Sequence, residues 1–172
     1  LGLVGSEMCI RDSCTRLCHA SSVSALLEGI GSGAVSNPFT DVKNAEVILL
    51  IGAYPIANHP VAATFIKNAV KDGKKLILMD PRRTELSRYA THSLHFRPDT
   101  DVPMLNSLMH VIIKEGLCDE KFISDHTTDF DKIRENVKDY DPRIVSSICG
   151  IEAEKLKEVA RVYASSESSI IL

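Results

Sequence analysis

Two short apolar runs, separated by a helical pattern, dominate the first half of the chain. Residues 46–51 (EVILLI) and 75–79 (KLILM) are apolar over almost their whole length. Such runs are typical of strands that are buried on both faces of a parallel sheet. Between them a helix is predicted from Asn58-His59-Pro60 to Gly73, with the buried stripe Val61, Ala62, Phe65, Ile66, Ala69 and Val70. The order strand, helix, strand predicts a βαβ unit with a right-handed crossover.

Helical periodicity fills most of the sequence after residue 100. One helix is predicted at 103–115, with Thr100 or Asp101 as its cap and with Leu105, Leu108, Met109 and Ile112 as its buried stripe. Further helical pieces are predicted at 120–124, 130–137, 142–148 and 153–164. Short strands are predicted at 93–96 and 169–172. Together these elements predict an α/β fold with a parallel sheet and a helical C-terminal half.

The composition narrows the class of protein. Of the 172 residues, 44% are hydrophobic and 25% are charged, which is enough apolar material for one globular domain. A net charge of -3 without a basic block argues against nucleic acid as the main partner, because phosphate binding needs clustered Lys and Arg. No apolar run approaches the roughly 20 residues that span a bilayer. The five cysteines, irregularly spaced, favour reduced thiols in the cytoplasm over a disulfide framework.

Both ends of the sequence are expected to be incomplete. Residues 1–13 carry no targeting pattern and are similar to translated sequencing-adapter sequence, so we interpret them as a non-native junction. Residues 168–172 stop inside a predicted strand. Residues 14–172 are therefore expected to be part of a larger protein.

Two loops are the places to look for a ligand. In open parallel sheets, ligands bind beyond the carboxyl ends of the strands. The loops that follow the two predicted strands at 46–51 and 75–79 are residues 52–59 and 80–84. Gly52-Ala53-Tyr54-Pro55 takes the place of a phosphate loop, but G-x-G-x-x-G is absent, and this disfavours an ordinary NAD site. Asp80 is placed either to accept hydrogen bonds from ribose hydroxyls or to form an Asx turn. Arg82 and Arg83 are either phosphate ligands or part of a solvated loop.

Other polar residues also have two interpretations. Asp99 and Asp101 are explained as caps of the following helix, but a carboxylate there also suits the donor hydrogens of a guanine edge. His59 is a helix cap or a ligand contact. The remaining residues of interest are expected at the surface, between helices or buried without a role: His92, His95, His110, His126, Cys118 and Cys149.

A thiol beside an imidazole precedes the first predicted helix. That helix is predicted to begin at Ser21 or Ser22 and to end in the glycines at 29, 31 and 33, with the buried face Val23, Leu26, Leu27 and Ile30. Cys18 and His19 come just before its N-terminus, where the helix dipole favours a thiolate, so Cys18 is a candidate metal ligand or nucleophile. A zinc site with Cys14 lacks a second ligand pair at finger-like spacing. A Cys-His nucleophile pair normally joins separate segments.

Four segments resemble, in the same order, those of the catalytic subunit of molybdopterin-dependent formate dehydrogenases. They are residues 14–22 (CTRLCHASS), 31–38 (GSGAVSNP), 52–55 (GAYP) and 80–83 (DPRR). The resemblance runs from Cys14 to Leu172, which identifies residues 14–172 as part of a molybdopterin oxidoreductase domain. It implies a Rossmann-like αβα fold and a bis(molybdopterin guanine dinucleotide) cofactor with molybdenum or tungsten.

The resemblance also implies residue roles. Cys18 stands where the family has its cysteine or selenocysteine metal ligand, and His19 stands at the adjacent histidine that handles protons, where related nitrate reductases tend to have Met. Tyr54 departs from a common G-x-N-P pattern. The family's guanine dinucleotide contact segments contain Gly52, Tyr54, Pro55, His59, Asp80, Arg82, Arg83, Asp99 and Asp101.

The implied reaction is the oxidation of formate to carbon dioxide, with transfer of two electrons to an iron-sulfur chain. The family's 4Fe-4S cluster belongs to an N-terminal segment outside this chain, and the implied partners are electron-transfer subunits or domains with iron-sulfur clusters. The fragment alone is therefore expected to be inactive. Two alternatives stay open: a nitrate or other oxo-anion reductase of the same superfamily, and a nucleotide-binding domain without a redox role.

Overall fold

The computed structural model describes residues 20–35 and 37–172. The chain divides into two compact units, residues 1–39 and 40–172, and each is treated by itself below. None of the helices within the described residues is both long and apolar enough to cross a membrane.

The described part of the first unit is one helix and the loop after it. Helix α2 spans Ala20–Ile30, and Gly31 ends it with a φ of 71° while donating its N–H to Leu27 O at 3.1 Å. The helix itself is as predicted, but its apolar stripe is not buried: among the described residues of this unit, none in α2 is buried, and Leu27 and Ile30 are exposed. Periodicity predicts where such a stripe lies, but not whether another element covers it.

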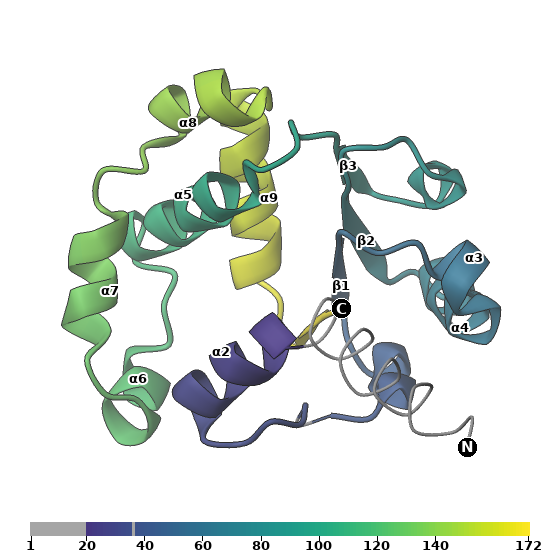
Figure 1. Cartoon of the computed structure of the whole chain (residues 1–172), viewed down its shortest axis with the longest axis horizontal. Helices are drawn as coiled ribbons and strands as arrows, with labels where there is room; N and C mark the ends of the chain where they lie inside the picture. The colour runs from purple at the N-terminus through teal and green to yellow at the C-terminus, as the bar shows by residue number, and fades with distance from the viewer. Residues whose placement is uncertain (1–19, 36) are drawn as a thin grey trace, which may run out of the picture. The chain divides into compact units, whose positions relative to one another are not determined.

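The second unit is built on a parallel sheet of four strands, as predicted (Figure 1). The strands are β1 (Val47–Ile51), β2 (Lys75–Met79), β3 (His92–Leu94) and β4 (Ser169–Ile171), and their order in the sheet is β3-β2-β1-β4. The β3 strand ends earlier than predicted, because its last paired residue, Leu94, lies opposite Met79 at the end of β2. Phe96 is buried without being part of the strand.

Helices cover both faces of the sheet, which confirms the three-layer αβα arrangement (Figure 1). Helices α3 (Pro55–Asn58) and α4 (Pro60–Lys71) lie on one side, and α5 (Asp101–Lys114), α8 (Pro142–Cys149) and α9 (Ala153–Ala164) lie on the other. Alternate strand residues point to opposite faces. The core on the side of α5, α8 and α9 is formed by Val47, Leu49, Ile77, Met79 and Leu94 with Met104, Leu108, Val145, Leu156 and Val159.

The helix positions were predicted better than the faces that they bury. Helix α4 buries Ala63, Ile66 and Ala69, whereas Val61 of the predicted stripe is 71% exposed. Helix α5 buries Met104, Leu108 and Val111, whereas Met109 is exposed. Two short helices that follow α5, α6 (Glu120–His126) and α7 (Phe130–Val137), were also predicted. The 3-10 helices η2 (Phe39–Lys43) and η3 (Glu85–Arg88) and the single turn α3 were not predicted.

Candidate nucleotide-binding site

The loop after β1 begins with a glycine in a left-handed conformation. Gly52 has a φ of 61° and donates its N–H to Met79 O at 2.9 Å, which ties the end of β1 to the end of β2. A Cβ at this position would meet nothing within 4 Å, so the backbone conformation, not space, requires glycine. The loop then turns through Tyr54 into α3, which begins at the buried Pro55.

The loop after β2 is anchored by a buried carboxylate. The Asp80 side chain is 1% exposed, and its Oδ1 accepts the Arg82 backbone N–H at 2.7 Å and Arg82 Nε–H at 3.3 Å. Its backbone N–H donates to Leu94 O at 3.1 Å, and His95 Nδ1 lies 3.2 Å from its carbonyl oxygen. The predicted Asx turn is therefore present. In this conformation Asp80 orients Arg82 and is not itself at the surface.

The two loops meet through Tyr54. The Tyr54 hydroxyl donates a hydrogen bond to Glu85 Oε2 at 2.6 Å, and the Arg82 guanidinium lies 5.6 Å from the Tyr54 ring centroid. This hydrogen bond raises the pKa of the Tyr54 hydroxyl and lowers the pKa of the Glu85 carboxyl. The pair therefore keeps a protonated phenol against an ionised carboxylate at neutral pH.

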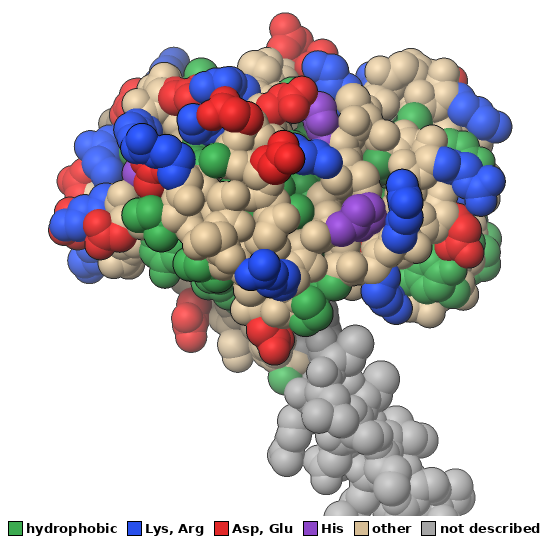
Figure 2. Space-filling view, turned by 90° about the horizontal axis from the view of Figure 1, so that it is seen from above, with side chains coloured by type: hydrophobic (Ala, Val, Ile, Leu, Met, Phe, Trp, Pro, Cys, Tyr) green, Lys and Arg blue, Asp and Glu red, His purple; other side chains and the backbone are tan. Residues whose placement is uncertain are grey.

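A cavity of about 400 Å³ lies beside this contact, lined by Tyr54, Arg82, Arg83, Thr84 and Glu85. A neighbouring cavity of about 260 Å³ shares Arg83, Thr84 and Glu85 and adds Ser87 and Arg88. The hydroxyl oxygens of Thr84 and Ser87 are buried and have no hydrogen-bond partner among the described residues. In the view of Figure 2, the part of the surface formed by α3, α4 and the loop after β2 carries more Lys and Arg side chains than Asp and Glu side chains. Three arginines, one glutamate and two unpartnered hydroxyls suit an anionic ligand rich in oxygen.

The other predicted contact residues surround the same edge of the sheet without lining these cavities. His59 lies between α3 and α4 and is exposed, and the described chain shows no cap bond from its side chain. Asp99 has a φ of 63°, and Asp101 is the first residue of α5; both are exposed. Of the two predicted caps, Thr100 occupies the N-cap position, whereas Asp101 as the cap is wrong because it is the first residue of the helix. Thr100 makes no side-chain cap bond to the described helix backbone, and its hydroxyl donates to Arg97 O at 2.6 Å.

The predicted metal-binding residues cannot be followed in the described part of the chain. Cys14, Cys18 and His19 fall outside the described residues. Within residues 20–35 and 37–172, no three His, Cys, Asp or Glu side chains come together as metal ligands. Cys149 is buried in the core, and Cys118 is half-buried, where burial raises the pKa of its thiol and disfavours a thiolate at Cys118.

Glu85 and Thr84 were missed at the sequence level. Their only signal is their position directly after Arg82 and Arg83, since the contact between Glu85 and Tyr54 joins residues 31 positions apart. Because parallel neighbours end at the same edge of a sheet, the loops after β1 and β2 are brought together, but a sequence does not say which side chains meet there.

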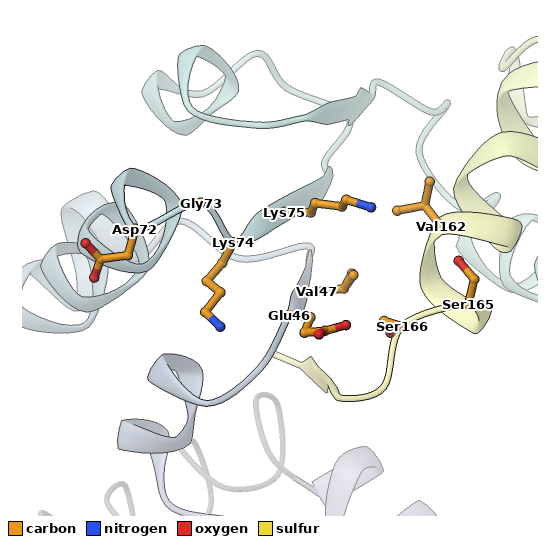
Figure 3. A pocket seen from close by; sticks show the side chains of 9 residues that line it. All are labelled: Glu46, Val47, Asp72, Gly73, Lys74, Lys75, Val162, Ser165 and Ser166. Atoms are coloured by element: carbon orange, nitrogen blue, oxygen red, sulfur yellow. The ribbon is translucent and has the colours of Figure 1, made fainter.

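A different cavity lies at the opposite, amino edge of the sheet (Figure 3). It has a volume of about 340 Å³, and its charged lining residues are Glu46, Asp72, Lys74 and Lys75. In Figure 3 the Lys75 side chain extends toward Val162 of α9. Its formal charges cancel, in contrast with the basic cavities beside Arg82, so the carboxyl edge is the better anion site.

Known proteins resemble the chain over nearly its whole length. The family model described as Molybdopterin oxidoreductase matches residues 1–155. The F420-dependent formate dehydrogenase subunit alpha of Methanocaldococcus jannaschii is 38% identical over 161 residues, which cover 94% of this chain and 24% of that protein. Formate dehydrogenase H of Escherichia coli is 35% identical, over 94% of this chain and 22% of that protein. The nitrate reductase of Synechocystis is 31% identical, over 94% of this chain and 23% of that protein.

A solved structure supports the same relationship. The acetylene hydratase of Pelobacter acetylenicus superposes with a TM-score of 0.79 at 28% sequence identity, covering 91% of this chain and 21% of that one. The chain spans about a quarter of the length of the curated relatives that it matches. From the family match, the identities and the shared fold, we conclude that the chain belongs to the molybdopterin oxidoreductase family.

Proposed function

We propose that the chain is the part of a formate dehydrogenase catalytic subunit that holds one guanine nucleotide of a bis(molybdopterin guanine dinucleotide) cofactor with molybdenum or tungsten. The observation that carries this proposal is the basic cavity beyond the carboxyl ends of β1 and β2, lined by Tyr54, Arg82, Arg83, Thr84 and Glu85. Ligands of open parallel sheets bind at this edge.

The residues present fit the nucleotide part of that cofactor. Arg82 and Arg83 supply N–H donors for phosphate oxygens, and Thr84, whose hydroxyl has no partner among the described residues, adds an O–H donor. The exposed carboxylates of Asp99 and Asp101 are suited to accept the N–H groups of a guanine edge. Gly52 ends β1 in a left-handed turn, and Pro55 and His59 lie at the two ends of the short helix α3 that follows it in the chain, on the loop where we place the ligand.

Asp80 acts in this proposal through Arg82. Because the Asp80 side chain is 1% exposed, a ribose hydroxyl can donate to its carboxylate only after the loop around it moves, and the Arg82 side chain that lies against Oδ1 is part of that loop. Arg82 is 68% exposed, so that movement breaks little packing. In either position the carboxylate controls what Arg82 offers to the ligand.

The proposed chemistry belongs to Cys18 and His19, which precede α2 in the sequence. A soft thiolate such as that of Cys18 suits molybdenum or tungsten, and metal binding keeps it deprotonated. A molybdenum or tungsten centre bound there would supply the two-electron redox chemistry that formate oxidation requires. His19, with an ordinary pKa of about 6.5, is suited to accept the proton near neutral pH.

The remaining proposals concern the whole protein. The proteins named formate dehydrogenase among the relatives support formate as the substrate. We place the 4Fe-4S cluster in a segment outside this chain, the iron-sulfur electron acceptors on other subunits or domains, and the enzyme in the cytoplasm. Residues 1–13 stay a predicted junction, and sequencing the flanking genomic region tests both that boundary and the cluster ligands: an upstream region without a C-x2-C-x3-C motif contradicts the proposal.

A second candidate function is reduction of nitrate or another oxo-anion, favoured by the 31% identity to the nitrate reductase of Synechocystis. The complete protein, assayed with a viologen dye, separates the two. Formate-dependent dye reduction without nitrate-dependent dye oxidation is the expected result, and the reverse overturns the proposal. Purified protein that contains neither molybdenum nor tungsten points instead to a nucleotide-binding domain without a redox role.

A further inference from the structure

We propose that Tyr54 and Glu85 are positioning residues that hold the Arg82 guanidinium in one orientation for a phosphate group of the bound nucleotide. This inference rests on the proposed nucleotide site. It adds an aromatic clamp, made by two loops, to the residues that contact the ligand themselves. Tyr54 comes from the loop after β1, and Glu85 is the first residue of η3, after β2.

The clamp begins with one strong contact between the loops. The hydrogen bond from the Tyr54 hydroxyl to Glu85 Oε2 measures 2.6 Å, at the short end for an O–H donor and typical of an ionised acceptor. Because the phenol oxygen lies at the far end of the ring, holding it fixes the first side-chain torsion and therefore the direction in which the ring extends from the backbone. Glu85 thus sets the position of the ring beside which Arg82 lies.

Arg82 is held on two sides. Its backbone N–H and its Nε–H both donate to Asp80 Oδ1, and its guanidinium carbon lies 5.6 Å from the Tyr54 ring centroid. Its terminal Nη1 and Nη2 groups have no hydrogen-bond partner within residues 20–35 and 37–172, and Arg82 lines the cavity. A guanidinium whose Nε is engaged presents these two nitrogens as a fork, which matches two phosphate oxygens.

The ring contact matters because Arg82 is an exposed side chain. At 68% exposure it would sample many rotamers if only Nε held it, and ordering it would weaken ligand binding. The contact with the Tyr54 ring lowers this entropy cost of binding, because it restricts the Arg82 side chain before the ligand binds. The clamp also gives a reason for a carboxylate in a cavity that binds phosphate. The negative charge of Glu85 would repel a phosphate, but its Oε2 accepts the hydrogen bond of the Tyr54 hydroxyl.

The test is a binding experiment on the complete protein, purified without cofactor, with guanosine 5′-diphosphate and with guanosine as probes in isothermal titration calorimetry. Tyr54→Phe keeps the ring but removes the hydrogen bond, and should weaken diphosphate binding about threefold to tenfold, the range for one hydrogen bond. Tyr54→Leu also removes the ring and should weaken it further. Glu85→Gln keeps an acceptor oxygen but removes its charge, so it should weaken diphosphate binding less than Tyr54→Phe does.

Two controls separate a clamp from a general structural effect. Tyr89→Phe removes a phenol hydroxyl from the residue that follows η3, where the described chain shows no hydrogen bond from that hydroxyl, and it should change nothing. Guanosine lacks the phosphates, so its affinity should be unaffected by Tyr54→Phe. The double variant Tyr54→Phe with Glu85→Ala should bind no more weakly than the weaker single variant, because both remove the same bond.

The outcomes distinguish this inference from the proposed function. If the original protein binds guanosine 5′-diphosphate and Tyr54→Phe binds it equally well, the clamp is overturned and the nucleotide site stands. If Tyr54→Phe weakens guanosine and the diphosphate by the same factor, the residue is structural and the clamp is likewise overturned. If the original protein binds neither probe, the nucleotide site itself is wrong.

Discussion

Replacing Asp80 tests whether a buried carboxylate organises the loop that carries Arg82. Asp80→Ala removes the acceptor of two hydrogen bonds, from the Arg82 backbone N–H at 2.7 Å and from Arg82 Nε at 3.3 Å. Asp80→Asn keeps a neutral acceptor oxygen in the same place. Arg82→Ala leaves the backbone hydrogen bond intact and removes only the exposed side chain. These three variants divide the interaction into its parts.

The structure ranks the three effects. A hydrogen bond to a charged, buried acceptor contributes about 1.5–3 kcal/mol, whereas an ion pair with an exposed partner contributes about 0–1 kcal/mol. Asp80 is 1% exposed and Arg82 is 68% exposed, so the backbone bond dominates. We expect Asp80→Ala to lower the free energy of unfolding by about 2 kcal/mol, Asp80→Asn by about 1 kcal/mol, and Arg82→Ala by less than about 1 kcal/mol.

Urea denaturation of the 172-residue chain, followed by far-UV circular dichroism, measures these differences. The denaturant slopes should agree among the variants, since none changes the surface that unfolding exposes. The reasoning is refuted if Arg82→Ala destabilises the chain as much as Asp80→Ala, because the exposed ion pair would then carry the interaction.

Three further predictions follow from the same kind of argument. Asp141 accepts the Arg143 N–H at the start of α8, and the Arg143 side chain holds the pKa of this carboxyl well below its usual range. The contribution of Asp141 to the free energy of unfolding is therefore complete above about pH 4, and it is lost as the pH falls through the lowered pKa. Asp141→Asn should lower the free energy of unfolding by about 1 kcal/mol at pH 7 and make it less dependent on pH in acid. Urea denaturation at a series of pH values from about 2 to 7 measures both effects. Arg97 donates from Nη1 to Ser147 O at 2.8 Å and to Ile148 O at 3.3 Å, at the end of α8. Arg97→Met should therefore lower the free energy of unfolding by about 1–2 kcal/mol, and Arg97→Lys should lower it less. Equal melting temperatures for the two variants would contradict this. In the complete protein, Cys18→Ser should reduce both the metal content and the activity, whereas His19→Ala should keep the metal and slow turnover about 100-fold or more. Mass spectrometry measures the bound metal in both variants. Equal metal loss in the two variants would contradict separate roles for the two residues.

The sequence was most informative where one local pattern decides the outcome. The runs at 46–51 and 75–79 are too short and too apolar for anything but buried strands, and β1 and β2 lie within them. Burial of helix faces was less predictable, because Val61, Met109 and Leu27 depend on which element packs against them, and periodicity carries no such information. The candidate site divides in the same way. Arg82 could be predicted from its place after a strand, but the contact of Tyr54 with Glu85 depends on how two loops meet in three dimensions.

The position of β4 in the sheet has a consequence for how the domain assembles. Ser168 joins Glu46 across a separation of 122 residues, through its hydroxyl and through backbone bonds that begin the pairing of β4 with β1. Closing a loop of that length costs more chain entropy than closing the shorter loops between β1, β2 and β3. The pairing of β4 with β1 should therefore form after the pairing of β1 with β2 and of β2 with β3. Until then the edge of β1 presents unpaired N–H and C=O groups next to an apolar strand. During synthesis the nascent chain therefore carries an edge prone to aggregation until β4 has been made and pairs with β1.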